Sequence, residues 1–139
     1  MGARILIVED EQIIAEDLAL RVGALGHNVV GFCISGEKAI AVAEDQKPDL
    51  ILMDIRLRGR MDGVECARII RERMRVGIVF VTAYPGSLLR DRPHLAEQEI
   101  CVNKPWSRPQ LEIAINKALG QRFPGSSAAS SNSQVDRPQ

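Results

Sequence analysis

The chain has 139 residues, which suits one domain; 45% of them are hydrophobic and only 4% aromatic, so aliphatic side chains must fill the core. Its 18 lysine and arginine residues balance 18 aspartate and glutamate residues, which gives no general attraction to nucleic acid or to an anionic membrane. No apolar run approaches the ~20 residues that span a bilayer, and we expect no signal peptide. The three cysteines lie far apart without C-x-x-C spacing, which indicates reduced core thiols and a cytoplasmic protein.

The first half of the chain alternates between strand-like and helical patterns. Short aliphatic runs predict strands, and apolar side chains at helical spacing predict helices between them. Ser35 is a candidate cap for the second helix, and Gly26 is a good stop for the first. In chain order, the predicted elements are a strand at 4–8, a helix at 12–25, a strand at 28–33, a helix at 38–44 and a strand at 50–53.

The predicted strand at 50–53 is the most apolar of these elements. Its sequence, Leu50-Ile51-Leu52-Met53, runs directly into the carboxylate of Asp54. A continuous apolar run of this length is typical of a strand that is buried on both faces of a parallel sheet. Open α/β sheets bind their ligands at the carboxyl ends of the strands. We therefore expect Asp54 at the edge of the sheet where chemistry takes place.

The second half repeats the alternation with one interruption. The predicted elements are a helix at 62–73, a strand at 77–81, a strand at 100–102 and a helix from 107 or 108 to 119 that Gly120 ends. Residues 85–98 contain Pro85, Gly86 and Pro93, so we expect the helix there to be short, broken or shifted. Residues 121–139 are rich in serine and predict a disordered tail or linker. The alternation predicts a parallel sheet with helices on both faces.

Polar side chains follow four of the predicted strands. Glu9 and Asp10 follow the first, Asp54 the third, Thr82 the fourth and Lys104 the fifth. Because the carboxyl ends of parallel strands share one edge, these side chains are predicted to meet. Three crowded carboxylates repel one another unless a cation joins them, and oxygen ligands suit Mg²⁺. Lys104 and Thr82 then fit an anion, such as a phosphoryl group on Asp54.

Read together and in this order, these motifs resemble the response-regulator receiver domain of two-component signalling. The resemblance covers roughly residues 5–119. It rests on Ile7-Val8-Glu9-Asp10-Glu11, Met53-Asp54-Ile55 with Met61-Asp62-Gly63, Val81-Thr82-Ala83 and Lys104-Pro105-Trp106. It implies a flavodoxin-like, doubly wound, five-stranded parallel sheet of strand order 2-1-3-4-5 with helices on both faces.

The resemblance also implies roles for individual residues. Asp54 would be the phosphorylation site, and Lys104 would contact the phosphate. Glu9, Asp10 and Asp54, with the backbone carbonyl of Arg56, would hold Mg²⁺. Thr82 would be the switch hydroxyl.

The chain departs from the family pattern at three points. The acidic pair is Glu-Asp where Asp-Asp is common. The loop after Asp54 lacks the usual proline and is one residue longer, so we expect it to be more mobile. Cys101 stands where the family often has the aromatic residue of a rotamer switch. In addition, Thr82-Ala83-Tyr84-Pro85 resembles a receiver subgroup linked to general stress responses.

Each motif alone has an ordinary structural interpretation. The acidic stretch would cap a helix, Thr82 would satisfy backbone groups, and Lys104-Pro105 would be a polar turn. Arg56, Arg58 and Arg60 are interpreted as a solvated face, with the alternative that they steer a phosphodonor. Among other classes, an aspartyl-nucleophile phosphatase would need a second aspartate where Arg56 stands, and a dinucleotide binder would need G-x-G-x-x-G, which is absent. A degenerate receiver that acts by contact alone is the main alternative.

The sequence therefore predicts a receiver domain at residues 1–120 and a disordered tail at 121–139. We expect a single-domain response regulator, or a receiver cut from a larger one, that catalyses only its own phosphorylation and slow dephosphorylation. Its expected partners are a sensor histidine kinase or phosphotransfer protein and a downstream protein target, with no nucleic acid or membrane, and it is expected to be a monomer or weak dimer. Thr82 and residues 85–98 are expected to shift on phosphorylation and to change a surface that includes Ile113.

Overall fold

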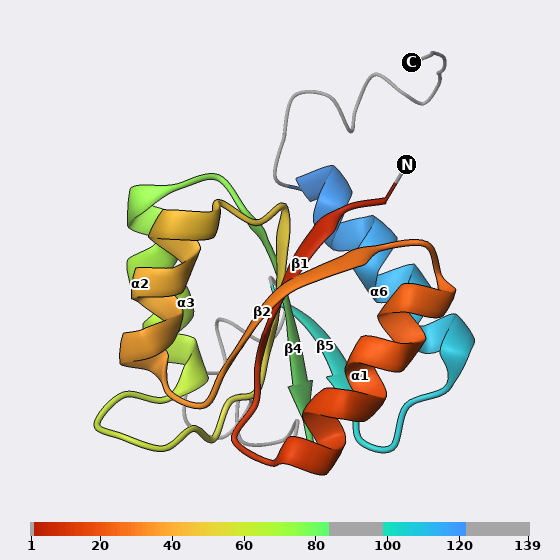
Figure 1. The fold of residues 1–139 in the computed structure, drawn as a ribbon, viewed down its shortest axis with the longest axis horizontal. Helices are drawn as coiled ribbons and strands as arrows, with labels where there is room; N and C mark the ends of the chain where they lie inside the picture. Colours follow the sequence, from red (N-terminus) through yellow and green to blue (C-terminus); the bar gives the residue numbers. More distant parts are fainter. Residues whose placement is uncertain (1, 84–98, 122–139) are drawn as a thin grey trace.

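A computed structural model describes residues 2–83 and 99–121 of the chain (Figure 1). Within these residues the predicted alternation of strands and helices is confirmed. The elements are β1 (Arg4–Val8), α1 (Gln12–Ala24), β2 (Asn28–Cys33), α2 (Gly36–Gln46), β3 (Leu50–Met53), α3 (Gly63–Arg73), β4 (Gly77–Thr82), β5 (Ile100–Asn103) and α6 (Arg108–Gln121). The short or broken helix predicted at 85–98, with Tyr84 before it, and the tail at 122–139 lie outside the described residues.

The five strands form one parallel sheet in the order β2-β1-β3-β4-β5, which confirms the predicted fold class. The order reverses direction at β1, because the chain first adds β2 on one side and then crosses to β3 on the other. In open α/β sheets, ligands bind outside the carboxyl ends of the strands at such a switch point. A binding site is therefore expected at the carboxyl ends of β1 and β3.

Helices cover both faces of the sheet. Helices α1 and α6 lie on one face and α2 and α3 on the other (Figure 1). Each face has its own apolar core, and the four residues of β3 are buried on both sides, as their continuous apolar run predicts. The largest fully buried side chains are Phe80, Ile5, Leu6, Ile7, Leu18, Leu50, Ile51, Leu52, Met53, Ile70, Ile78 and Leu111. Aliphatic residues thus fill the core, as the low aromatic content requires.

Local signals in the sequence set some of the helix ends. Ser35 Oγ accepts a hydrogen bond from the backbone N–H of Lys38 and caps α2, as predicted. Gly26, directly after the C-cap of α1, has a φ of +93°, a left-handed conformation that favours glycine. The last helix was expected to stop at residue 119, before Gly120, and this end is wrong by two residues. Gly120 keeps a helical backbone, so α6 continues to Gln121.

No helix in the described part of the chain combines the length and the apolar composition that crossing a bilayer requires.

Candidate functional site

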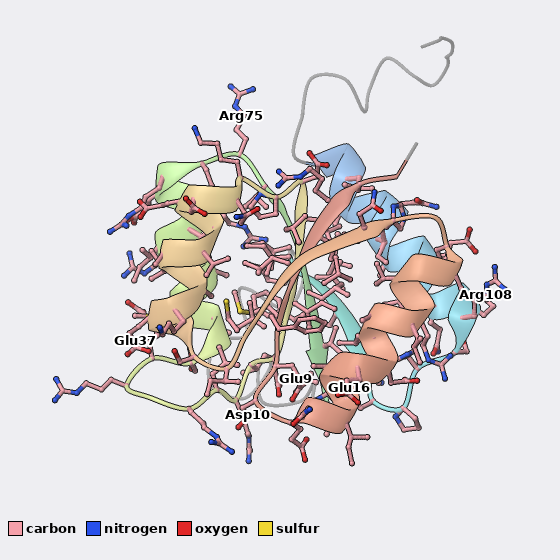
Figure 2. The ribbon with its side chains drawn as sticks, viewed as in Figure 1. Glu9, Asp10, Glu16, Glu37, Arg75 and Arg108 are labelled. Carbon is pink, nitrogen blue, oxygen red and sulfur yellow. The ribbon has the colours of Figure 1, made fainter. Side chains whose placement is uncertain are left out.

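The predicted site residues meet at the carboxyl edge of the sheet. Figure 2 shows Glu9 and Asp10 together at this end of the molecule, with Arg75 at the opposite end. Glu9 directly follows β1 and Asp54 directly follows β3. The backbone N–H of Glu9 donates to the carbonyl of Cys33 at 2.9 Å, and the N–H of Asp54 donates to the carbonyl of Val8 at 2.9 Å. Sheet-like hydrogen bonding therefore continues past the strands and fixes where both carboxylates begin.

Three carboxylates form a compact cluster at this edge. Glu9 is 3% exposed and Asp54 is 7% exposed, whereas Asp10 lies at the solvent boundary. One carboxylate oxygen from each of the three lies within 4.8 Å of the others. Like charges at this separation raise one another's proton affinity unless a cation joins them. The cluster that the strand ends predicted is thus present in the described structure.

Lys104 joins two of these acids. Its Nζ donates to Oε1 of Glu9 at 2.8 Å and to Oδ2 of Asp54 at 3.3 Å. Its backbone N–H donates to the carbonyl of Thr82 at 2.9 Å, which ties the end of β5 to the end of β4. The peptide bond between Lys104 and Pro105 is cis. The ammonium is therefore held between Glu9 and Asp54, although Lys104 follows the edge strand β5, which β4 separates from β3.

Burial and charge shift the proton affinities of this pair. Burial raises the pKa of Glu9 to about 7, and the negative charge of Asp54 adds to this, while the hydrogen bond from Lys104 opposes it. Burial lowers the pKa of Lys104, but its hydrogen bond to Glu9 and the nearby carboxylates outweigh burial, so its pKa is raised. Lys104 consequently stays an ammonium at neutral pH, whereas Glu9 can exchange a proton near pH 7.

Thr82 and Arg56 complete the set of predicted site residues. Thr82 is the last residue of β4, is 2% exposed and pairs in register with Asn103 of β5. Arg56 lies two residues after Asp54, and its backbone N–H donates to Oδ1 of Asp54 at 3.3 Å. The structure thus brings Asp54, Lys104, Glu9, Asp10 and Thr82 to one edge, as expected, with the backbone of Arg56 beside them.

The donor set fits a hard divalent cation. Three carboxylates supply oxygen ligands, which Mg²⁺ prefers, and one lysine does not neutralise all of them. Asp10 lies closest to solvent of the three, so the cluster opens to water on its side. An ion that keeps several of its waters, as Mg²⁺ does, suits a cluster that is open on one side.

Sequence reasoning missed two contacts of the loop between β3 and α3. Nε of Arg58 lies 3.8 Å from Oδ2 of Asp10, while the arginine itself is exposed, as the interpretation of a solvated face expects. The backbone N–H of Arg60 donates to Oε2 of Glu37 at the start of α2. The regular spacing of the arginines at 56, 58 and 60 next to an acidic cluster was the signal that could have found the first contact.

The cysteines take the structural role predicted for them. All three are free thiols, and none has a sulfur partner. Burial raises the pKa of Cys66 to about 12 and that of Cys101 to about 11. Cys101 packs against the core on the face covered by α2 and α3, so it fills space where the family pattern often has an aromatic residue.

Comparisons with known proteins agree with this geometry. Residues 5–116 match the family described as the response regulator receiver domain. The chain is 36% identical over 121 residues to the phyllosphere-induced regulator PhyR of Methylorubrum extorquens, covering 86% of this chain and 44% of that protein. It is 36% identical over 118 residues to the transcriptional regulatory protein PdtaR of Mycobacterium tuberculosis, covering 85% of this chain and 57% of that protein.

A solved structure shares the fold. The crystal structure of the anti-anti-sigma factor PhyR from Bartonella quintana superposes with a TM-score of 0.78 at 33% identity, covering 93% of this chain and 52% of that one. The chain therefore spans about half the length of these three relatives.

Proposed function

The chain belongs to the response regulator receiver domain family, and from this premise we propose that Asp54 accepts a phosphoryl group from a phosphohistidine of a sensor histidine kinase or phosphotransfer protein. Receiver-domain regulators of this type are signalling proteins and not enzymes. The observation that carries the proposal is the position of Lys104, whose ammonium contacts Asp54 and Glu9 while Asp10 lies beside them. A carboxylate that is held next to both a cation and an acidic cluster suits phosphoryl transfer better than a structural role.

The chain's own groups account for the transfer step. An oxygen of Asp54 forms a bond to phosphorus while the phosphorus–nitrogen bond to the donor histidine breaks, and the imidazole keeps the electron pair. Lys104 neutralises charge on the phosphoryl oxygens, because its Nζ is already 3.3 Å from Oδ2 of Asp54. Thr82, buried at the end of β4, supplies a hydroxyl for a phosphoryl oxygen. Water later cleaves the acyl phosphate and restores the carboxylate.

Asp10, Asp54 and the backbone carbonyl of Arg56 are the groups that would hold Mg²⁺, with Glu9 completing the acidic pair. The bound ion supplies positive charge that offsets the charge of the transferring phosphoryl group. Asp10 contributes an oxygen at the solvent side, and Asp54 contributes one from the floor of the site. Because Glu9 already accepts a hydrogen bond from Lys104, its role includes holding that lysine in place.

Phosphorylation would pass its signal to other proteins through contact surfaces. Thr82 is adjacent to Ala83 and to residues 84–98, which lie outside the described residues, so the expected shift of 85–98 stays a prediction. Ile113 on α6 is 66% exposed, and we include it in the surface that meets the target. A relative is named an anti-anti-sigma factor, and we extend to this chain only that its target is another regulatory protein.

Two other functions are considered beside that of a phosphoaccepting receiver that acts on its own. The chain spans about half of its relatives, which supports a receiver that works within a larger regulator. A degenerate receiver would act by contact alone, but the presence of Asp54, Lys104, Thr82 and the acidic pair at one edge favours phosphorylation.

The direct test is incubation of the protein with Mg²⁺ and acetyl phosphate, followed by intact mass measurement. We expect the mass of one phosphoryl group to be added, and to disappear when Mg²⁺ is chelated beforehand. An unchanged mass with acetyl phosphate and with phosphorylated kinases would favour the degenerate receiver.

A further inference from the structure

A loop rich in arginine runs beside the acidic cluster. It joins β3 to α3 and carries Arg56, Arg58 and Arg60 at alternate positions. Nε of Arg58 lies 3.8 Å from Oδ2 of Asp10, an acid of the cluster. Its side chain is 69% exposed, and that of Asp10 is 25% exposed, so the pair lies at the solvent entrance. The contact is therefore with the carboxylate that an entering cation meets first.

The backbone of the loop is held in place around Arg58. Arg58 forms an isolated parallel bridge with Ser35, and the N–H of Arg60 donates to Oε2 of Glu37 at 3.3 Å. Gly59 has a φ of +98°, and a Cβ there would lie 2.8 Å from Oε1 of Glu37. Figure 2 shows Glu37 at the start of α2, beside this loop. The loop therefore packs closely against the start of α2 and holds Arg58 at the rim of the site.

Two positively charged side chains lie next to different members of the acidic cluster. Lys104 contacts Glu9 and Asp54, while Arg58 contacts Asp10. The protein thus places a cationic side chain beside each carboxylate, although two positive charges do not balance three negative ones. A divalent cation that binds Asp10 has to share that carboxylate with the guanidinium or displace it, because the two positive charges repel each other.

We propose that Arg58 is a built-in competitor of the metal: its guanidinium, which lies beside Asp10, lowers the affinity of the site for Mg²⁺ and so raises the Mg²⁺ concentration at which the site fills. This inference rests on the proposed function, because it takes Asp10 as a metal ligand.

The effect is expected to be moderate. Exposed ion pairs contribute little, so removing this one should tighten Mg²⁺ binding about two- to fivefold. The effect should shrink at high ionic strength, because salt screens exposed charges. Arg58→Gln removes the charge and keeps a long polar side chain. Because the side chain of Arg58 is exposed, this substitution should leave the fold intact.

The test titrates the purified chain with MgCl2 alone, without any phosphodonor. Isothermal titration calorimetry gives the affinity, and fluorescence of the single tryptophan, Trp106, which lies two residues after Lys104, gives a second readout. Arg60→Gln is the matched control. It removes the same charge from the same loop, while the contact of residue 60 with Glu37 uses the backbone and is retained.

We expect Arg58→Gln to bind Mg²⁺ about two- to fivefold more tightly than wild type at low salt, and Arg60→Gln to stay close to wild type. Equal affinities for the two variants, or weaker binding by Arg58→Gln, would overturn the inference while leaving the proposed function intact. A wild-type chain that binds no Mg²⁺ in calorimetry would instead remove the metal site itself, and the inference with it.

Discussion

Nζ of Lys104 lies 2.8 Å from Oε1 of Glu9, although 95 positions separate the two residues in the sequence. The side chain of Lys104 is 13% exposed and that of Glu9 is 1% exposed, so the pair is largely removed from water. Such pairs are weak evidence for stability, because desolvation offsets most of the attraction between the charges. The contact is better explained by what it positions: it keeps an ammonium at 3.3 Å from Asp54.

The first prediction is that Asp54→Asn abolishes phosphorylation. The amide keeps the size of the side chain but lacks the nucleophilic carboxylate, so no phosphoryl group should be added from acetyl phosphate. Asp62→Asn is the control from the same loop. Asp62 caps α3 by accepting a hydrogen bond from the N–H of Glu65, and asparagine caps helices about as well. Intact mass should show full uptake in Asp62→Asn; uptake in Asp54→Asn would exclude Asp54 as the acceptor.

The second prediction concerns the metal ligands. Asp10→Asn should weaken Mg²⁺ binding by more than about tenfold, since even groups that only support a ligand have effects of that size. The free energy of unfolding without metal should change by less than about 1 kcal/mol, because the ion pair with Arg58 is exposed. Asp17→Asn, which removes an exposed acid paired with Arg21 on α1, should leave Mg²⁺ binding unchanged. Equal losses in both variants, measured by calorimetry, would point to general charge instead of a ligand.

Strand positions were predictable because β1 and β3 have continuous aliphatic runs and the other strands are short and largely apolar. The bounds of β2 and β3 agree with the sequence to the residue, and β4 and β5 extend one residue further than expected. The meeting of Asp54 and Lys104 also followed, since parallel strands end at one edge. The positions of the central strands depend on burial, which hydrophobic patterning encodes directly.

Side-chain pairing within the site was not predictable in the same way. Nothing in the sequence distinguishes Lys104 bound to Glu9 from Lys104 bound to Asp54 alone, because the choice depends on how deeply each group is buried. The pairing of Arg58 with Asp10 depends on the path of a loop, which Glu37 and the left-handed Gly59 determine. These contacts come from tertiary packing between distant segments, so local sequence patterns do not predict them.

The third prediction is a pH effect at Glu9. Its pKa is raised from 4.5 to about 7 by burial, so between these values the unfolded chain loses a proton that the folded chain keeps. The stabilisation from this group is therefore complete below pH 4.5 and is lost as the pH rises through 7, by on the order of 3 kcal/mol. Glu9→Gln removes the titration.

In EDTA, the free energy of unfolding of Glu9→Gln minus that of wild type should increase between pH 5 and pH 7.5. Lys104 stays charged over this range, because its pKa is raised, and so does not contribute to the slope. Denaturant unfolding at several pH values measures the difference. Parallel curves for the two proteins would contradict the prediction.

The last prediction links the backbone of the site to the stability of the fold. Gly63, the first residue of α3, donates its N–H to the carbonyl of Ile55 at 2.6 Å. A Cβ at Gly63 would overlap the carbonyl oxygen of Asp54 and would lie 2.9 Å from Cα of Ile55. Both obstacles are backbone atoms, so no side-chain rotation can relieve them. Gly63→Ala must move α3 or the segment that carries Asp54.

We expect Gly63→Ala to lose at least about 3 kcal/mol of unfolding free energy, in the range of strained or overpacked sites. Any folded fraction should accept phosphate slowly, because Asp54 is displaced from Lys104. Gly23→Ala is the control: Gly23 lies in α1 with nothing within 4 Å of its Cβ position, so alanine should stabilise the helix by about 0.5–1 kcal/mol. Urea unfolding of both variants would decide the matter, and a Gly63→Ala protein as stable as wild type would show that this close approach of the two segments is not required.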